Sequence, residues 1–416
     1  MHSFSNKRKI INDPVYGFIS IPDELIFDVI EHPWFQRLRR IKQLGLTQLV
    51  YPGALHTRFH HALGAMHLMQ QAIETLRLKG QRITEDEAKG VLLAILLHDI
   101  GHGPYSHALE HSIVENMDHE DLSLLFIEQL NRHFDNQLET ALAIFSNRYP
   151  KRFLHQLVAS QLDMDRLDYL KRDSFFTGVS EGVISTDRII KMLNVANDEL
   201  VVEAKGIYSV EKFIIARRLM YWQVYFHKTV LSAEQMIIKL LQRAQMLAQQ
   251  GSLLFATPAL LKFLKNKYSR QDFNQDPGLL EAFAMLDDFD ILASMKVWCG
   301  HEDKILSLLS CFLTQRKLFA VDISGNPANE AHLTELKQQT AARFGISPDE
   351  AGFLVFSGTI TNNAYDPEKD KILILNKDGS LDDIARASDQ LNVSVLSAPV
   401  SKYYTGYPKV LRKPSN

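Results

Sequence analysis

Cysteine is scarce in this sequence, and long apolar runs are missing. The 416 residues include two cysteines, Cys299 and Cys311, which are too few for a disulfide framework and indicate a reducing compartment. No apolar stretch approaches the roughly 20 residues that a membrane helix needs, and the first residues lack the apolar core of a signal peptide. We therefore expect a cytoplasmic protein without a membrane partner.

An excess of one charge is lacking as well. The 46 Lys and Arg residues nearly balance the 49 Asp and Glu residues, which gives a formal net charge of −3 with neutral histidine. A net charge this close to zero gives no sign of a basic surface for nucleic acid, so we expect no nucleic-acid partner. A polyanionic substrate would have to bind at a local cluster of basic residues. Internal repeats and low-complexity segments are absent, and the composition is typical of a soluble globular protein.

Helical periodicity dominates the sequence up to residue 315. The predicted helices span 23–30, 33–44, 57–78, 85–98, 106–116, 119–131, 153–172, 186–192 and one very long segment, 208–249, with more helix to about residue 312. Residues 10–21 are predicted to form a short strand or turn, and 200–204 a strand. The pattern therefore predicts a mainly α fold for residues 1–315.

The pattern changes after residue 316. Four strands are predicted at 318–323, 353–360, 371–376 and 392–397, separated by helices at 330–344 and 381–390. Residues 316–416 should thus form a small α+β C-terminal domain. No motif in it carries chemistry, which favours a role in packing or oligomerisation.

Histidines are concentrated in one part of the chain, since 9 of the 16 lie between His56 and His119. Within that part, an apolar helix ends at the adjacent pair His98 and Asp99, and Gly101 then interrupts the helix. Burying either polar group without a partner would cost several kcal/mol. A divalent metal is a natural partner, although His98 capping one helix and Asp99 capping the next is the structural alternative.

Further metal donors precede and follow this pair. His61 lies on the helix before it, and Asp165 lies in the later segment SQLDMDRLDYLKRD. Two imidazoles and two carboxylates would leave positions open for water and phosphate, as a catalytic metal requires. The structural alternatives are a core-edge role for His61 and, for Asp168 with Arg172, an i,i+4 ion pair on a solvated face.

Acid–base and cationic groups occur in the same region. His107 and Glu110 are three residues apart at a predicted helix start, which favours a dyad that protonates a leaving oxygen, and His119 opens the next helix and could join it. Arg58 precedes His61 by three residues and Arg166 follows Asp165, so both should lie beside the metal, where phosphate oxygens need neutralising.

The order H…HD…D resembles that of the HD phosphohydrolase superfamily. The closer resemblance is to its deoxynucleoside-triphosphate triphosphohydrolase branch, which includes the vertebrate enzyme with a sterile-alpha-motif domain; no such domain is predicted in these 416 residues. The segments that carry the resemblance, from about residue 9 to 230, are NDPVYGFI, FQRLRRIKQLG, YPGALHTRFHHALG, LLHDIGHGPYSH, DHE, DMDRLDYLKRD and ARRLMYWQVYFHK. It implies an HD core at about 50–175 within the helical domain.

The resemblance also implies roles for single residues. The implied metal ligands are His61, His98, Asp99 and Asp165, and the implied catalytic group is His102, His107, Glu110 and His119. The implied substrate-binding residues are Arg58, Arg166 and Arg217 for the triphosphate, Gln43, Tyr169 and Asp173 for the 3′-hydroxyl, Leu44 against the sugar, and Tyr225 and His227 near sugar and base. His60 stands where relatives commonly carry an acidic residue, so its role is open.

A regulatory nucleotide site is implied too, because in the vertebrate relative a nucleotide binds away from the catalytic site and drives assembly. The matching positions are Lys9, Glu31, Gln36, Arg39 and Arg316. Glu31 replaces an aspartate that reads guanine, and Ala320 replaces a phosphate-binding lysine. The resemblance therefore implies a homo-oligomer, dimer or tetramer, while the alternative is a helix with a solvated basic face.

The implied reaction converts a dNTP and water to a deoxynucleoside and intact triphosphate. It uses a divalent transition metal, Mn, Fe, Zn or Ni, with Mg²⁺ accompanying the substrate phosphates. Two alternatives stay open. One is another HD phosphohydrolase, acting on GTP, a nucleotide monophosphate or a signalling nucleotide. The other is a nucleotide-sensing or nucleic-acid-binding regulator with a vestigial site.

Overall fold

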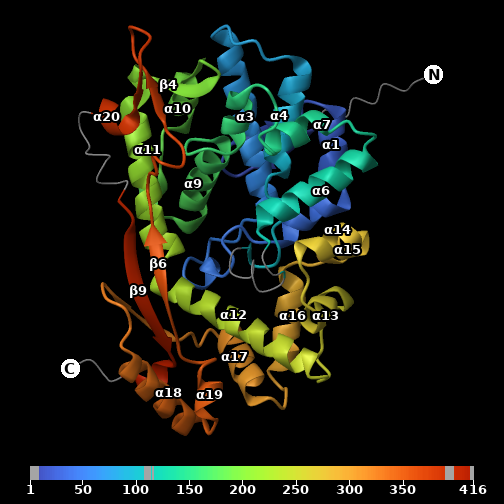
Figure 1. Cartoon of the computed structure of the whole chain (residues 1–416), viewed down its shortest axis with the longest axis vertical. Helices are drawn as coiled ribbons and strands as arrows, with labels where there is room; N and C mark the ends of the chain where they lie inside the picture. Colours follow the sequence, from blue (N-terminus) through green and yellow to red (C-terminus); the bar gives the residue numbers. More distant parts are fainter. Residues whose placement is uncertain (1–8, 107–113, 115–116, 389–397, 413–416) are drawn as a thin grey trace.

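A computed structural model describes residues 9–106, 114, 117–388 and 398–412 of the chain. The predicted helix 106–116 lies almost wholly outside the described residues, and the predicted strand 392–397 lies entirely outside them. The described part is mainly helical, with three small sheets at its periphery (Figure 1). The mainly α prediction, with a smaller α+β part toward the C-terminus, is confirmed.

The helices before residue 200 build the core around the site. They are α1 (Glu24–Glu31), α2 (Pro33–Gln36), α3 (Arg58–Leu78), α4 (Glu85–Leu97), α6 (His119–His133), α7 (Glu139–Phe145), α8 (Arg152–Val158), α9 (Met164–Thr177) and α10 (Thr186–Met192). Local signals set their ends: Thr84 and Glu87 form a capping box for α4, and α9 ends at Gly178, whose φ of 74° is left-handed. Helices α3 and α4 pack against each other, and α3 packs against α9.

Most of the later helices lie below this core in Figure 1, whereas the first and the last of them, α11 and α20, lie at its upper left. The later helices are α11 (Ile207–Met220), α12 (Lys228–Gln249), α13 (Pro258–Lys265), α14 (Arg270–Gln275), α15 (Pro277–Ala284), α16 (Asp288–Trp298), α17 (Lys304–Thr314), α18 (Glu330–Phe344), α19 (Pro348–Ala351) and α20 (Ile384–Ala387). Short 3₁₀ turns include η1 (Arg37–Arg40) and η2 (Thr47–Leu49). No described helix has both the length and the apolar composition that a membrane crossing requires.

Three of the predicted helices are wrong in their extent. The predicted helix 153–172 is interrupted between Val158 and Met164, because the Asp163 side chain accepts hydrogen bonds from the backbone N–H groups of Ser160 and Arg166 and starts a new helix. The predicted helix 33–44 ends at Gln36 and continues only as η1. The predicted helix 381–390 begins as a strand and becomes helical at Ile384.

The very long helix predicted at 208–249 is also wrong, since a π-helical turn, η6 (Tyr221–Tyr225), divides it into α11 and α12. The His227 side chain then caps α12 by accepting a hydrogen bond from the Thr229 N–H at 3.2 Å. Such turns insert an extra residue into the helical ladder and are frequent at functional sites. Here the turn points Tyr221, Tyr225 and Phe226 into one pocket.

Three small antiparallel or mixed sheets complete the fold. Strands β1 (Ile10–Asp13) and β2 (Gly17–Ser20) form a hairpin, and β9 (Val400–Tyr407) lies between β5 (Ala320–Ser324) and β6 (Phe356–Asn362). The third sheet has the order β3 (Leu193–Ala196), β4 (Glu199–Glu203), β7 (Leu373–Leu375) and β8 (Leu381–Asp383). The predicted strands at 318–323, 353–360 and 371–376 correspond to β5, β6 and β7.

The third sheet crosses the predicted domain boundary. Strand β4 belongs to the helical part, yet it pairs in parallel with β7 from the C-terminal part, with Val202 opposite Ile374. The Gln161 amide also donates to the carbonyls of Asp366 and, at 2.5 Å, of Asp370. The division at residue 316 stays a prediction, but the two parts share a sheet.

Candidate metal and substrate site

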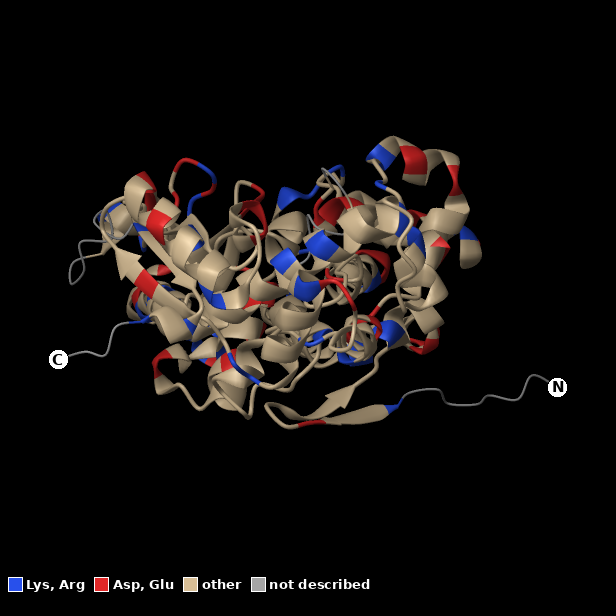
Figure 2. Cartoon of the chain, turned by 90° about the horizontal axis from the view of Figure 1, so that it is seen from below, with Lys and Arg blue, Asp and Glu red and all other residues tan. Residues whose placement is uncertain are grey.

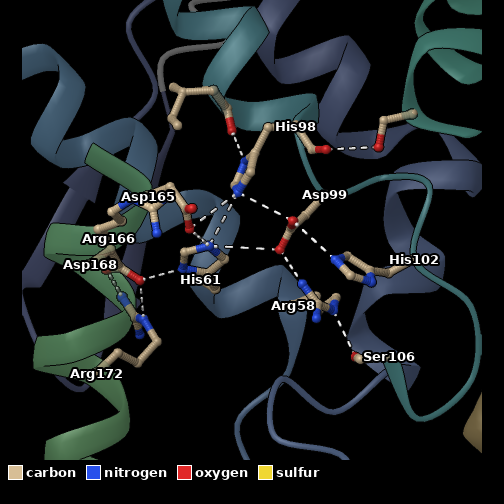
Figure 3. Close-up of polar contacts among 12 residues, drawn as sticks. Arg58, His61, His98, Asp99, His102, Ser106, Asp165, Arg166, Asp168 and Arg172 are labelled. Atoms are coloured by element: carbon tan, nitrogen blue, oxygen red, sulfur yellow. Dashed lines mark hydrogen bonds and ion pairs between the residues drawn. The ribbon is translucent and has the colours of Figure 1, made fainter. Parts of the chain in front are cut away.

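Four side chains from three helices meet at one point (Figure 3). His61 comes from α3, His98 and Asp99 from the end of α4, and Asp165 from the first turn of α9. The His61 Nε2 lies 3.3 Å from the His98 Nε2 and 3.0 Å from the Asp165 Oδ1. The Asp99 carboxylate is on the other side, with Oδ1 3.3 Å from the His98 Nε2 and Oδ2 3.7 Å from the His61 Nε2.

These separations fit a metal ion. With metal–ligand bonds of about 2.1 Å, neighbouring donors of a tetrahedral or octahedral site lie about 3.0–3.4 Å apart. The buried group of His61, His98 and Asp99 could therefore hold a metal. Asp165 Oδ1 lies 3.5 Å from the His98 Nε2 and would complete the four donors expected from the sequence.

Both imidazoles are oriented by the atoms behind them. The His98 Nδ1 lies 2.6 Å from the carbonyl oxygen of Ile95, which can only accept, so Nδ1 carries the proton. The His61 Nδ1 lies 2.7 Å from the Asp168 Oδ2 and donates to it in the same way. Each Nε2 is thus the ring nitrogen that faces the shared point, where a metal can replace its proton, as in histidine ligands of metals.

Asp168 is a functional residue that the sequence reasoning placed wrongly. The ion pair of Asp168 with Arg172 does lie at i,i+4, with Nε 2.9 Å from Oδ2, but both side chains are 0% exposed rather than solvated. The Arg172 Nη1 also lies 2.7 Å from the Asp13 Oδ2, on the β1–β2 hairpin. A line of three side chains therefore connects the hairpin to His61.

Glycines allow the helices around these side chains to pack closely. Gly64 on α3 faces Asp168 and Arg172, and a Cβ at Gly64 would lie 2.1 Å from both the Asp168 Oδ1 and the Arg172 Nη2. At the end of α4, a Cβ at Gly101 would lie 2.3 Å from the carbonyl oxygen of His119. The Gly101 N–H donates to the Ser123 Oγ at 2.9 Å, which fixes the start of α6 against the metal group.

Negative charge surrounds the imidazoles. Burial opposes protonation of His61, but the hydrogen bonds that its ring donates to Asp165 and Asp168 outweigh it and raise the pKa of His61 to about 10. Burial likewise opposes ionisation of Asp165, yet the hydrogen bonds from His61 and His98 hold its pKa well below the ordinary value. The site attracts positive charge, which is the electrostatic condition for holding a cation.

Of the three arginines predicted to bind phosphate, Arg58 and Arg166 lie beside the metal donors, as predicted. Arg58 is 2% exposed, forms an ion pair with Asp99, and donates through Nε to the Ser106 Oγ at 2.8 Å. The Arg166 Nε donates to the carbonyl oxygen of Ser160 at 2.6 Å. Both side chains line the same pocket as Asp99 and Asp165.

The predicted acid–base group is only partly described. His107 and Glu110 lie outside the described residues. The rings of His102 and His119 stack at 3.9 Å with an interplanar angle of 14°, and His119 begins α6 as expected. The His102 Nε2 lies 3.3 Å from the Asp99 Oδ1. Burial, then the charges of Arg58 and His119, hold the pKa of His102 well below its usual value.

A pocket of about 470 Å³ continues from this group along α9. The predicted substrate residues that line it are Gln43, Leu44, Arg58, Arg166, Tyr169, Asp173 and Tyr225. Two of their polar atoms, the Gln43 Oε1 and the Tyr169 hydroxyl, are buried without a hydrogen-bond partner among the described residues. Buried polar atoms normally have partners, so a bound molecule is the natural one here.

His56 was missed by the sequence reasoning, although it belongs to the histidine cluster. Its Nε2 lies 2.7 Å from the Asp173 Oδ1, and its ring stacks on Phe176 at 4.5 Å. The second oxygen of Asp173 accepts a hydrogen bond from the Tyr225 hydroxyl at 2.8 Å. His56 therefore orients the carboxylate of Asp173 from behind.

Two predicted substrate residues, and also His60, lie outside the lining of this pocket. Arg217 and His227 are not among the residues that line the pocket. The buried Arg217 Nε lacks a hydrogen-bond partner among the described residues, and His227 caps α12. His60 occupies the third position of the α3 capping box, where its Nδ1 accepts from the Thr57 N–H at 3.2 Å. An acidic side chain at this position could accept the same hydrogen bond.

The predicted regulatory residues are only partly grouped. The Lys9 ammonium lies 4.3 Å from the centre of the Phe27 ring, and the Arg39 Nε donates to the Gln36 Oε1 at 2.7 Å. Glu31 is exposed at the end of α1. The Arg316 Nε donates to the Leu49 carbonyl at 2.8 Å, and no contact joins Arg316 to the other four within the described residues. A regulatory site stays a prediction.

Comparison with known families and proteins agrees with this geometry. The family model of the HD domain matches residues 58–173, and that of the HD associated region matches 184–254. YwfO of Bacillus subtilis, an uncharacterized protein, is 33% identical over 92% of this chain and 88% of its own. A crystal structure of a phosphohydrolase from Bacteroides thetaiotaomicron is 55% identical, covers 96% of this chain and 100% of its own, and superposes with a TM-score of 0.93.

A third relative has a named activity. The SAMHD1 homolog of Dictyostelium discoideum, a deoxynucleoside triphosphate triphosphohydrolase, is 34% identical over 57% of this chain and 49% of its own length. The present chain thus spans about half of that relative. The chain belongs to the HD-domain phosphohydrolase superfamily, close to the dNTP triphosphohydrolase branch.

Proposed function

We propose that this protein is a metal-dependent dNTP triphosphohydrolase, which converts a dNTP and water to a deoxynucleoside and triphosphate. The observation that carries the proposal is the pocket that joins the His61, His98 and Asp99 group to the buried, unpartnered polar atoms of Gln43 and Tyr169. One end has metal donors and two arginines, while the other offers hydrogen bonds to an uncharged group. A nucleoside triphosphate has this polarity.

His61, His98, Asp99 and Asp165 would hold a divalent transition metal. The chemistry that such a metal supplies is activation of water and neutralisation of phosphoryl charge. The two oriented Nε2 atoms and the carboxylates fit Mn, Fe, Zn or Ni, with Mg²⁺ accompanying the substrate phosphates.

The chain's own residues supply the remaining charge and protons. Arg58 and Arg166 line the pocket beside the carboxylates and would bind phosphate oxygens through their guanidinium groups. His119, whose ring stacks on that of His102 beside Asp99, is in a position to hold a proton for the leaving 5′-oxygen, and His102 would assist as a neutral imidazole. His107 and Glu110, which follow His102 in the sequence, are proposed to join them.

Sugar selection would rest on the part of the pocket next to Asp165. Tyr169 and Asp173 follow Asp165 on α9 at steps of one turn, and Gln43 and Leu44 face the same pocket. The Tyr169 hydroxyl and the Gln43 oxygen would bind the 3′-hydroxyl. A 2′-hydroxyl beside Leu44 would lose its water without gaining a partner, so ribonucleotides should be poor substrates.

The test is a turnover panel of the four dNTPs and four NTPs with Mn²⁺ or Mg²⁺, with products separated by ion exchange. The proposal requires a deoxynucleoside and tripolyphosphate as primary products and a preference for dGTP over GTP. Orthophosphate as the primary product, or turnover of GTP, a nucleotide monophosphate or a signalling nucleotide alone, would favour another HD phosphohydrolase. No turnover of any of them would favour a nucleotide-sensing regulator.

The metal has its own test in Asp165→Ala. This variant should keep the helical circular dichroism of the parent, lose its bound transition metal by elemental analysis, and lose activity. Asp187→Ala, which removes an exposed carboxylate from α10, is the matched control and should retain both. A full metal complement in Asp165→Ala would remove Asp165 from the ligand set.

A further inference from the structure

Two carboxyl groups that line the substrate pocket, Glu120 and Glu234, have no role in the proposed reaction. Glu234 lies two turns into α12 and lines the same pocket as Asp99, Asp165 and Tyr169. No hydrogen bond or ion pair reaches its carboxyl group from the described residues. Burial raises the pKa of Glu234 to about 7, and no charged group among the described residues offsets this loss of water.

Glu234 lines the pocket from α12, a helix that carries none of the metal donors. The pocket follows α9 from Asp165 past Tyr169 to Asp173, and Asp173 accepts a hydrogen bond from Tyr225, in the π-helical turn that precedes α12. Helix α12 packs against η2 and β5, whereas the metal donors belong to α3, α4 and α9. Figure 1 shows α12 crossing the molecule below α9.

The surroundings of Glu234 suit a flat, uncharged group. Tyr221, Tyr225 and Phe226 line the pocket with it, and aromatic rings provide stacking surfaces for nucleobases. A carboxyl group repels phosphate, and the arginines that line the pocket, Arg58 and Arg166, lie at the metal end. With triphosphate at that end and the sugar beside Tyr169, the base must extend toward α12.

We propose that Glu234 reads the base of the nucleotide and favours guanine. A carboxylate accepts two hydrogen bonds side by side, and guanine presents two adjacent donors, the N1–H and the 2-amino group, on one edge. Thymine presents one N–H between two carbonyl oxygens, so one of its oxygens would face the carboxylate. This inference rests on the proposed function, because it needs a nucleoside triphosphate in the pocket.

The test compares substrates within each variant, which cancels general effects on folding or catalysis. The protein and its Glu234→Gln variant are assayed with dGTP, dITP and dTTP, where dITP lacks only the 2-amino group of guanine. A hydrogen bond to a charged group is worth about tenfold or more in kcat/KM. The protein should therefore prefer dGTP to dITP by at least about tenfold, and Glu234→Gln should reduce this preference to about twofold or less.

The dGTP-to-dTTP ratio should fall in Glu234→Gln as well, because a glutamine amide can both donate to and accept from thymine. Glu120→Gln is the matched control, since Glu120 is another carboxylate of the pocket but adjoins His119 at the metal end, and its substrate ratios should equal those of the protein. Glu234→Asp shortens the side chain by one methylene and draws the carboxylate back. It replaces Glu234→Gln as the test variant if Glu234→Gln does not fold, and it should lower the same substrate ratios.

The outcomes separate the two proposals. Equal dGTP-to-dITP ratios in the protein and in Glu234→Gln, with tripolyphosphate still released, would overturn the role of Glu234 and leave the reaction intact. If the protein releases tripolyphosphate from none of these nucleotides, the proposed function itself fails.

Discussion

At the scale of single residues, the site depends on side chains that do not touch its centre. His61 owes its orientation to Asp168, which is held by Arg172, which in turn is held by Asp13 on the N-terminal hairpin. A buried arginine with two carboxylate partners is difficult to replace, because its planar fork satisfies both at once. Outer partners of this kind usually affect metal affinity by about 10- to 100-fold.

Arg172→Lys tests this line of side chains. Lysine keeps the charge but cannot bind Asp168 and Asp13 with parallel N–H groups, so His61 should lose its fixed orientation. We expect metal affinity to fall by about 10- to 100-fold, measured by competition with a chelator, while helical content persists. Arg188→Lys on the surface of α10 is the control. Equal metal affinity in both variants would show that His61 needs no such support.

The buried carboxyl group of Asp288 should make the stability of the protein depend on pH. Burial raises the pKa of Asp288 to about 6, although its carboxylate accepts hydrogen bonds from the N–H groups of Tyr105 at 2.7 Å and Lys42 at 3.0 Å. Because the folded state binds this proton more tightly than the unfolded state, the contribution of Asp288 to the free energy of unfolding falls as the pH rises toward and past 6. Lys42 and Asp287 are the charged groups that act on it.

Between pH 5 and pH 7.5 the loss attributable to Asp288 should be on the order of 1 kcal/mol. Urea denaturation at both pH values, with the protein and with Asp288→Asn, measures it. The variant should be less stable at both, since the amide cannot accept both hydrogen bonds, but its loss between the two pH values should be smaller by this amount. An identical pH dependence in both proteins would contradict the assignment.

At the scale of elements, interruptions in helices bring the site together. The break between α8 and α9 starts a new helix at Asp163 and sets Asp165 in its first turn, and the π-helical turn between α11 and α12 directs Tyr225 toward Asp173. The contact between α3 and α9 is close because Gly64 has no side chain. These helices carry the metal donors His61 and Asp165, so their spacing determines the donor distances.

Gly64→Ala should disturb this contact. The new methyl group would lie 2.1 Å from the Asp168 Oδ1 and the Arg172 Nη2, both of which are packed and cannot move away easily. We expect a loss of about 1–3 kcal/mol in the free energy of unfolding, measured by thermal denaturation. Gly300→Ala, where the nearest atom is 3.9 Å away, should differ little from the parent. Equal losses in both variants would show that the contact of Gly64 with Asp168 and Arg172 is not the cause.

At the scale of the whole molecule, the C-terminal part is built into the helical part. Strand β7 extends the β3–β4 hairpin, the Ser232 hydroxyl of α12 donates to the Phe319 carbonyl at 3.1 Å, and Ile374 belongs to the same buried core as α3 and α4. Basic and acidic residues are interspersed over the ribbon (Figure 2), in keeping with the small net charge.

Removal of residues 316–416 should therefore destabilise the rest of the chain. It would expose the edge of β4 and the apolar residues that β5 and β7 cover, and unpaired edges of this kind promote aggregation. We expect a lower melting temperature and larger particles by light scattering for residues 1–315 than for the full chain. An unchanged melting temperature and an unchanged metal content would establish residues 1–315 as an independent domain.

Part of this architecture follows from local sequence. Thr57, Thr84, Asp163 and Asp303 cap helices with side chains that reach only three residues ahead, so most helix starts could be predicted. Helix 186–192 and helix 330–344 have the bounds that periodicity predicts. The breaks at 159–163 and 221–225 could not be predicted from apolar periodicity, because it continues through both.

The sequence by itself determined the kinds of donor at the site, because imidazole and carboxylate groups at His61, His98, Asp99 and Asp165 are typical of one class of metal chemistry. Only the tertiary structure decided which polar groups would be buried together. Asp13 and Asp168 meet Arg172, and Glu234 joins a pocket formed by residues up to 191 positions away, as Gln43 is. Local patterns are set by hydrogen bonds within one turn, whereas burial depends on which helices pack together, and that choice belongs to the whole chain.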